Sequence, residues 1–473
     1  MANIEKSIRT ALAAGILLIT LTVATGCTAS SSGEAGMEPD YRGVTIPCNV
    51  APLNFRYTGT GRVPVTRFSA GDVSVTIRGN SIRWKLRKWR KLLATAAGDS
   101  IRIESSILGH WSVAVSRDSI DRYLTYRLIE PGYEVWDRVE IRERDISTFE
   151  ERTLCDWRHT GNACMNCHIH KGDRSMLHIR GKGGGTILGG DTRLRKVNLV
   201  NDGMSSPAAY GDLHPDGRWG VFSSNTVIPA FHTLGSRRME VYDRTSDLTV
   251  ADFESNRMLN DEEYARPDRL ETFPCFSADG ESVFYCVADT VELPREVTKL
   301  KYSICKASFC PRTGALGHSP ETVWDADSNN ASACHPKASP DGKWLMFTRA
   351  DYGTFPIWHR ECDLGLIDLR SGKEISMATV NSNVSDTYHS WSSNSKWFVF
   401  ASKREDGQYG KPFICHIDGN GVCSKPFILP QRDPRHYERT LKSYNVPDLG
   451  TVPAPYDAET TGALHKIEAE KFD

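Results

Sequence analysis

The sequence has almost no net charge and no long run of basic residues. Its 58 lysines and arginines are balanced by 59 aspartates and glutamates, which gives a formal net charge of −1 at pH 7. Nucleic-acid-binding proteins carry clustered basic residues in excess, so we do not expect DNA or RNA as a partner. The basic stretch at residues 83–91 contains Trp84 and Trp89 and could form a polyanion- or glycan-binding face. We favour the simpler interpretation that both indoles pack inward and the basic side chains lie in solvent.

The sequence also lacks the common catalytic motifs. It contains neither a Gly-x-Ser-x-Gly nucleophile elbow nor a His-Glu-x-x-His zinc motif. The glycine-rich run at residues 181–185 is not followed by the Lys-Ser or Lys-Thr of a phosphate-binding loop, so it predicts a turn between strands. These absences favour an electron carrier or a binding protein over an enzyme.

Long apolar runs are absent except near the N-terminus. Residues 11–23 form an apolar run that follows Lys6 and Arg9 and ends at Ala24-Thr25-Gly26-Cys27. The run is shorter than the about 18 to 20 residues of a membrane span and fits the apolar region of a secretory signal. A cysteine directly after small residues at the end of such a run resembles a lipobox.

The lipobox predicts cleavage before Cys27 and a lipid on that cysteine. We therefore expect a signal peptide over residues 1–26 and a flexible tether over residues 27–44, with simple secretion or an N-terminal anchor as alternatives. The expected location is the cell envelope, on the periplasmic side of the outer membrane, with the lipid holding the protein to the membrane.

The most specific motif is Cys164-Met165-Asn166-Cys167-His168. Cys-x-x-Cys-His is the attachment signature of c-type haem, because two closely spaced thiols add to the two vinyl groups of one haem. The adjacent His168 is then the proximal ligand of the iron. The sequence predicts covalent haem c, with its iron, at Cys164, Cys167 and His168.

A second axial ligand is less clearly marked. We favour Met176 slightly over His178, because the eight or ten residues after His168 are enough to pass around the edge of the ring. Both could equally be ordinary strand residues. A vacant position would suit ligand sensing. More distant candidates are His159, His214, His335 and His389.

Two other interpretations of the motif remain open. Cys155, Cys164, Cys167 and His168 could together bind zinc, although adjacent Cys167 and His168 are awkwardly placed to share one ion. Alternatively, Cys164 and Cys167 could form a redox disulfide, although the usual thioredoxin-like βαβ context is absent.

The chain has 13 cysteines, of which ten remain after Cys27, Cys164 and Cys167 are set aside. Disulfides are permitted in an exported protein. Two pairs flank turn-like segments and could bond across hairpins, namely Cys415 with Cys423 and Cys275 with Cys286.

Four similar segments recur at intervals of about 50 to 60 residues, a period typical of propellers. Each is a tight turn, such as Ser-Pro-Asp-Gly-Lys, followed by an apolar strand; they span residues 214–223, 277–285, 339–347 and 392–400. Three more strand-like runs directly after the haem motif could form a fifth unit; they are residues 176–179, 185–188 and 194–200. We predict an all-β protein with a five- or six-bladed propeller over residues 175–440.

Short alternating strands precede this region and predict a small β-sandwich-like domain over residues 45–150. Residues 151–174 would then form a haem-binding linker. Residues 441–473 would form a C-terminal tail that supplies part of the ring closure or a small helix.

The Ser-Pro-Asp-Gly-Lys units resemble the TolB-type propeller repeat. The chain as a whole resembles exported TolB-like propeller lipoproteins that are sometimes labelled cytochrome c biosynthesis proteins. The matching segments are Ile46–Phe55, Arg127–Glu134 and Cys164–His168. This resemblance implies a fold and a location and does not establish an activity.

The sequence thus favours a lipid-anchored monohaem electron carrier whose propeller docks a redox or protein partner in the cell envelope. The alternative is a non-catalytic propeller that binds a protein, peptide or glycan, with a structural or sensory haem. An oxidoreductase would need an open iron site and is the third possibility.

Overall fold

A computed structural model describes residues 35–59, 61–130, 138–190, 193–231 and 239–473. The predicted signal peptide, Cys27 and the start of the tether lie outside these residues. No helix in the described ranges is long and apolar enough to cross a membrane.

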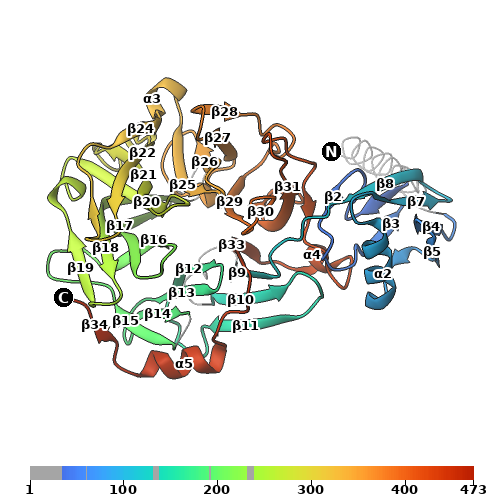
Figure 1. The fold of residues 1–473 in the computed structure, drawn as a ribbon, viewed down its shortest axis with the longest axis horizontal. Coiled ribbons are helices and arrows are strands. Elements are labelled where there is room, and N and C mark those ends of the chain that lie inside the picture. The colour runs from blue at the N-terminus through green and yellow to red at the C-terminus, as the bar shows by residue number, and fades with distance from the viewer. Residues whose placement is uncertain (1–34, 60, 131–137, 191–192, 232–238) are drawn as a thin grey trace, which may run out of the picture.

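Six sheets of four or five strands form a ring in the described part of the chain (Figure 1). Blade 1 contains β9 (Tyr123–Ile129), β10 (Glu140–Asp145), β11 (Glu151–Asp156) and β33 (Ser443–Gly450). Blade 2 contains β12 (Met165–Lys171), β13 (Arg174–Ile179), β14 (Gly185–Gly189), β15 (Arg195–Asn198) and β34 (Glu470–Lys471). Blade 3 contains β16 (Ala208–Leu213), β17 (Trp219–Phe231), β18 (Met239–Asp252) and β19 (Arg257–Asn260).

The other three blades follow in chain order. Blade 4 contains β20 (Arg269–Phe276), β21 (Ser282–Asp289), β22 (Ser303–Cys310), β23 (Ala315–Leu316) and β24 (Glu321–Trp324). Blade 5 contains β25 (Ser332–Ala338), β26 (Trp344–Ala350), β27 (Asp363–Asp368) and β28 (Lys373–Ile375). Blade 6 contains β29 (Asp386–Trp391), β30 (Trp397–Ser402), β31 (Lys411–His416) and β32 (Phe427–Ile428). Short helices between strands are η2 (Glu262–Tyr264), η3 (Val297–Lys299), α3 (Ala326–Asn329), η4 (Pro356–Trp358) and α4 (His436–Arg439).

The ring is closed. Its innermost strands contact one another in the order β33, β12, β16, β20, β25 and β29, and β29 contacts β33 again. The predicted all-β propeller class is therefore confirmed, with six blades in the described residues.

In blades 3 to 6 the predicted turn joins the inner strand to the second strand. Gly217, Gly280, Gly342 and Ser395 all have positive φ at the tip of the repeated turn. In blade 5 the hydroxyl of Ser339 accepts a hydrogen bond from the backbone N–H of Trp344 at 3.0 Å, which fixes the turn. The strand after each turn lies between neighbouring blades, so its first residues are mostly apolar and buried.

Two predicted boundaries differ from the sheets. Residues 151–174 are not a linker, because β11 and β12 lie in them, and the propeller begins at Tyr123 and not at residue 175. In blade 1 the inner strand is β33, which comes from the far end of the chain. The strands β9, β10 and β11 therefore lack the turn between an inner and a second strand that marks the repeat in blades 3 to 6. Blade 2 turns at Gly172, which has positive φ, and has no Ser-Pro-Asp-Gly segment there.

The C-terminal segment contributes three elements to the propeller and is not a tail. β33 pairs with β9 and completes blade 1, α5 (Ala458–Lys466) packs against β11 and β14, and β34 pairs with β15. Ring closure and a terminal helix, which the sequence offered as alternatives, both occur.

The N-terminal domain contains two sheets and one helix. One sheet contains β1 (Gly36–Glu38), β3 (Phe55–Thr58) and β6 (Ser81–Ile82). The other contains β2 (Thr45–Ile46), β8 (Gly109–Val115), β7 (Ser100–Ser105), β4 (Val65–Ala70) and β5 (Val73–Arg78). The helix α2 (Leu86–Ala96) packs on the second sheet, with Trp84 and Trp89 buried and the basic side chains exposed, as expected. This domain ends near Val115 and takes in β1, which lies in the segment predicted as tether.

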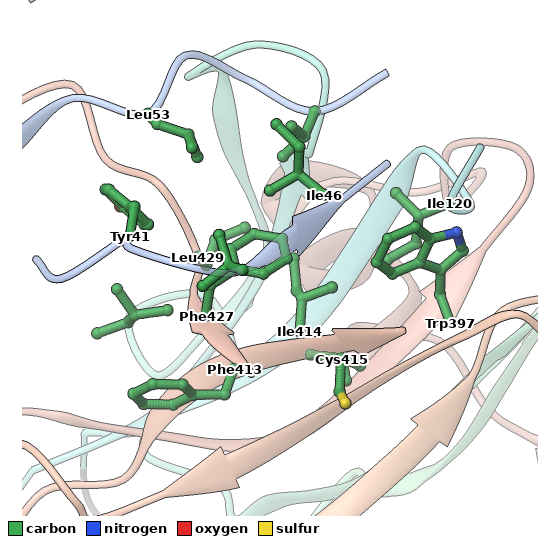
Figure 2. Packing of buried hydrophobic residues seen from close by; sticks show 14 of the residues in the cluster. Tyr41, Ile46, Leu53, Ile120, Trp397, Phe413, Ile414, Cys415, Phe427 and Leu429 are labelled. Atoms are coloured by element: carbon green, nitrogen blue, oxygen red, sulfur yellow. The ribbon is translucent and has the colours of Figure 1, made fainter. Parts of the chain in front are cut away.

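A shared apolar cluster joins this domain to blade 6. Figure 2 shows Ile46 of β2 above Ile414 of β31, with Trp397 of β30 beside them. The indole of Trp397 is fully buried and donates to the carbonyl of Asp118 at 3.1 Å. The Ser393 hydroxyl at the turn of blade 6 donates to the Asp121 carboxylate at 2.6 Å. These contacts hold the domain against blade 6, and the Ala51 amide also donates to the Ile146 carbonyl of blade 1 at 2.7 Å.

The twelve described cysteines are thiols in the structure. Cys275 and Cys286 do not face each other across their hairpin, because Cys275 pairs with Phe284 and Cys286 pairs with Thr272. Cys415 and Cys423 interact as neighbouring thiols, so of the two suggested pairs the structure favours this one.

We expect the closing strand to contribute strongly to stability. Leu449 in β33 is 2% exposed, whereas Leu441 just before the strand is 62% exposed. Leu449→Ala should lower the free energy of unfolding by about 2 to 5 kcal/mol in urea titrations, because it leaves a cavity between blades. Leu441→Ala should stay within about 0.5 kcal/mol of the parent protein. Equal effects of the two changes would contradict the closing role of β33.

Candidate functional site: the propeller channel

The six inner strands share one irregularity. In each of them the pairing with the next strand shifts register once, which leaves a bulge. The bulges contain Cys167, Ala209, Phe273, His335, Tyr388 and Val446. Apart from Ala209, these residues have φ between 48° and 58°, a conformation that costs about 1 to 3 kcal/mol in a non-glycine residue. β-Bulges redirect side chains, and here every bulge residue lines the central channel.

The channel encloses a cavity of about 490 Å³. This volume lies within the range of roughly 300 to 1,000 Å³ that is typical of small-molecule sites. Each blade contributes wall residues, so the cavity belongs to the ring and not to any one blade.

Four rings form a continuous aromatic belt around this cavity. The belt consists of Tyr210, Phe273, His335 and Tyr388, from blades 3 to 6. Ring centroids are 4.4 Å apart for Tyr210 and Phe273, 3.9 Å for Phe273 and His335, and 4.8 Å for His335 and Tyr388. Cys167 of blade 2 and Val446 of blade 1 complete the circle.

The two cysteines of the haem motif lie beside the channel. Cys164 directly precedes β12 and Cys167 is the bulge residue of that strand, and both are half-buried. Burial raises the pKa of the Cys167 thiol to about 11, while Arg180 and Arg127 act in the opposite direction and Cys164 is near enough to raise it further. Cys167 lines the cavity and Cys164 does not.

His168 is a buried imidazole with unused nitrogens. Its side chain is 4% exposed, it lines the cavity, and neither ring nitrogen has a hydrogen-bond partner in the described residues. Burial lowers the pKa of His168 to about 4, although Asp448 opposes this shift, so the ring is neutral at pH 7. Buried polar atoms without partners are rare in proteins and require an explanation. A neutral imidazole with a free lone pair is the form that binds a metal.

The predicted distal ligands lie on the other face of the same sheet. Met176 packs with Leu213 and Phe222 of blade 3. In contrast, Leu177, the strand partner of His168, packs with residues of blade 1. Although Met176 is among the residues that line the cavity, the sheet separates it from the face that carries the His168 ring.

His178 is on the same face as Met176. Its Nδ1 lies 2.7 Å from the Thr186 hydroxyl, and its ring packs edge-on against Phe222. Burial lowers its pKa to about 3. The structure thus brings Cys164, Cys167 and His168 together and does not bring Met176 or His178 to them.

The zinc interpretation of the motif receives no geometric support, whereas the redox disulfide between Cys164 and Cys167 stays a prediction. Cys155 lies in the apolar contact between blades 1 and 2, with its sulfur 2.9 Å from that of Met165. The described residues contain no group of three or more His, Cys, Asp or Glu side chains that could hold a metal ion. The glycine-rich run at residues 181–185 is the predicted turn, between β13 and β14.

Asp448 connects three blades at the channel wall. Its carboxylate accepts from the backbone N–H of His170 at 2.9 Å and pairs with Lys337 at 3.2 Å. The next residue, Leu449, donates its N–H to the Ser390 hydroxyl at 3.1 Å. Burial would raise the pKa of Asp448, but Lys337, Ser390 and the His170 amide outweigh it and hold the pKa below its usual value.

The half-buried side chain of Arg127 forms no hydrogen bond or ion pair with the described residues. It lies on β9 in the cavity wall, and its Nε is buried with no hydrogen-bond partner. No ion pair joins Arg127 to a carboxylate in the described part of the chain. The neighbouring Arg180 differs, because it donates to the carbonyls of Pro207 and Ala208.

These residues fit a covalently attached haem at three points. Two neighbouring thiols are available for the thioether bonds, and His168 offers a buried, unbonded nitrogen to the iron. Cys164, Cys167 and His168 would hold the group without Met176 and His178, which pack against blade 3 and Thr186.

The repeat begins before the turns, and its earlier residues include those of the aromatic belt, which the turn motif alone does not predict. The segments Thr272–Ser277, Cys334–Ser339 and Thr387–Ser392 precede the turns and already resemble one another. Asn166–Lys171 aligns with them, so Cys167-His168 corresponds to Tyr388-His389. Extending the repeat backwards by five residues identifies the channel wall.

No protein-family model matches the sequence, and no curated protein matches it. Among solved structures, a TolB protein from Agrobacterium tumefaciens is 13% identical, with a TM-score of 0.38 over 66% of this chain and 89% of that chain. The periplasmic gluconolactonase of Pseudomonas aeruginosa is 13% identical, with a TM-score of 0.35 over 65% of this chain and 96% of that chain. A hypothetical selenium-binding protein from Sulfolobus tokodaii is 8% identical, with a TM-score of 0.41 over 84% and 95% of the two chains.

Likenesses of this degree support no inference about activity, ligand or partner. The propeller assignment rests on the closed ring of sheets. Membership of the lipoprotein family that the sequence resembles stays a prediction.

The buried histidines predict a loss of stability in mild acid. His389, on β29, has its Nε2 2.9 Å from the Met346 carbonyl, and burial with the nearby Lys337 lowers its pKa to about 3, although Asp448 and that carbonyl oppose the shift. The unfolded chain takes up this proton near pH 6.5 and the folded chain does not. Stability should therefore fall as the pH drops from about 6.5, by up to about 1.4 kcal/mol per pH unit for each such histidine.

Urea titrations between pH 7 and pH 5 measure this effect. His389→Gln should reduce the pH dependence of the unfolding free energy by about one proton. The matched control is His110→Gln, at an exposed position of β8, which should leave the dependence as it is. Parallel curves for His389→Gln and the parent protein would show that His389 does not titrate in this way.

Proposed function

We propose that this protein is a lipid-anchored, one-electron carrier of the cell envelope that holds a single haem c at the wall of its propeller channel. The observation that carries this proposal is the buried imidazole of His168, with no partner on either nitrogen, directly after two half-exposed neighbouring thiols. Cys164 and Cys167 would form the thioether bonds, and His168 would be the proximal ligand.

The haem would supply one-electron oxidation and reduction. The residues of this chain would hold and shield it. β33 covers the face of β12 that carries the next histidine, because the ring of His170 lies against the backbone of Gly450. Asp448 anchors β33 there through the His170 amide, so His168 is fixed by the same contact that closes the ring. The outer surface of the propeller would dock the redox partner.

A second function is favoured by the size of the cavity. Its wall extends well beyond Cys167 and His168 to the aromatic belt, so the channel could bind a ligand of its own. The protein would then be a binding module for a protein, peptide or glycan, and the haem would be structural or sensory.

Haem staining tests the proposed cofactor directly. The full chain, produced in a host with c-type maturation machinery, should stain for haem after denaturation, because thioether bonds survive unfolding. The double change Cys164→Ser/Cys167→Ser should abolish the stain. Cys48→Ser, at another half-buried cysteine, should leave it unchanged.

Because Met176 and His178 lie on the opposite sheet face, Met176→Leu and His178→Gln should not alter the absorbance spectrum of the ferrous protein. His168→Gln should alter it. A parent protein without covalent haem would overturn the proposed function. A haem-free double cysteine variant that folds and still captures the same partner would favour the binding module.

Membrane fractionation tests the proposed lipid anchor at Cys27. Cys27→Ala should move the protein from the membrane fraction to the soluble envelope fraction, because a lipid on Cys27 is the proposed attachment. Ser30→Ala, in the same segment, is the matched control and should leave the protein with the membrane. Recovery of the Cys27→Ala protein with the membrane would contradict lipid anchoring at this residue.

A further inference from the structure

We propose that the channel holds a flat aromatic group that bears a carboxylate, with the ring system against the aromatic belt and the carboxylate paired with Arg127. This inference rests on the proposed function in one respect. A haem attached at Cys164 and Cys167 is itself such a group, through its propionates, and a free aromatic carboxylate is the other possible source.

The first argument is the charge of the wall. Lys337 pairs with Asp448, Lys171 pairs with Asp212, and Arg174 donates to backbone carbonyls. Arg127 has neither a carboxylate nor a carbonyl partner among the described residues. A guanidinium whose Nε is out of contact with water is costly to leave unpaired. Its planar set of donors matches a carboxylate in two parallel hydrogen bonds.

The second argument is the shape and polarity of the surroundings. Arg127 is the strand partner of Asn445, which directly precedes Val446, the bulge residue of blade 1. It therefore lies at the level of the belt. Around this level the cavity wall is largely apolar, with Ile129, Val241 and Phe355 among its residues.

Such a wall suits a sugar or a free phosphate less well, because these ligands need many hydrogen-bonding partners. It suits an apolar, planar body with one anionic end. Aromatic side chains stack on planar groups, and the belt presents its rings side by side around much of the channel. The Nδ1 of His335 is buried without a partner and offers the ligand one more polar contact.

The experiment uses the full chain produced without haem maturation and two probes, protoporphyrin IX and 1-naphthoate. Binding is followed by quenching of tryptophan fluorescence, since Trp358 and Trp391 line the cavity. Arg127→Gln should weaken binding of protoporphyrin IX about tenfold or more, the usual effect of losing a charge-assisted hydrogen bond. The dimethyl ester of protoporphyrin should bind the parent protein as weakly as the acid binds the variant.

Two matched changes exclude a general effect on the fold. Arg127→Lys keeps the charge and should retain most of the affinity, and Arg266→Gln, at an exposed arginine paired with Asp268, should retain all of it. Equal affinity of the acid for the parent and Arg127→Gln proteins, equal affinity of the acid and the ester, or no binding of either probe would overturn the inference.

A second arm identifies the source of the ligand. If the natural group is an attached haem, the haem-loaded protein should not bind added porphyrin and the Cys164→Ser/Cys167→Ser protein should. If it is a free carboxylate, both proteins should bind equally. The haem stain decides the proposed function, and the Arg127 dependence in haem-free protein decides this inference, so the two can fail separately.

Discussion

The carboxylate of Asp448 links β33, the strand that closes the ring, to two other blades. It lies on β33, the strand that completes blade 1, and it contacts the backbone of β12 in blade 2 and the ammonium of Lys337 in blade 5. A buried carboxylate is stable only when its hydrogen bonds and its counter-charge are both present. The position of β33 therefore determines the channel wall as well as the closure, because the same strand presents Val446 to the cavity.

The same β-bulge occurs in all six inner strands of the described ring and determines which side chains face the channel. The bulge turns one side chain of each inner strand into the channel, and it does so whatever that side chain is. Cys167-His168 occupies the bulge of blade 2 as Tyr388-His389 occupies that of blade 6. His168 therefore occupies the same position in blade 2 as His389 in blade 6. Blade 2 differs in having a cysteine, Cys167, at the bulge, with Cys164 three residues before it.

Much of the fold follows from local sequence. The Ser-Pro-Asp-Gly turns identify blades 3 to 5, because Gly217, Gly280 and Gly342 supply the positive φ that the turn requires. The alternation of Val73, Val75 and Ile77 correctly predicts β5. Blade 1 is different, since its inner strand lies about 300 residues from its second strand and no local pattern connects Asn445 with Arg127.

The sequence predicts only the part of the site that the haem motif forms. Cys164, Cys167 and His168 are close together in the sequence, so their spacing is enough to predict haem attachment. The choice of Met176 and His178 used chain length as the criterion, and length does not reveal that a strand following a tight turn presents alternate residues to opposite faces. Arg127 belongs to the site only because β9 and β12 lie in neighbouring blades, a relation that the ring creates.

Closure by β33 also determines when the channel becomes enclosed as the chain folds. Synthesis runs from the N-terminus, so β9 and β12 exist long before β33 is made. During that interval β9 is an uncovered edge, and the face of β12 that carries His168 and His170 is open to solvent. The channel is then a groove with one missing wall, and a bulky group can be placed against Cys164 and Cys167 from the side. When β33 pairs with β9, the groove becomes an enclosed cavity, so the last strand of blade 1 completes the channel wall.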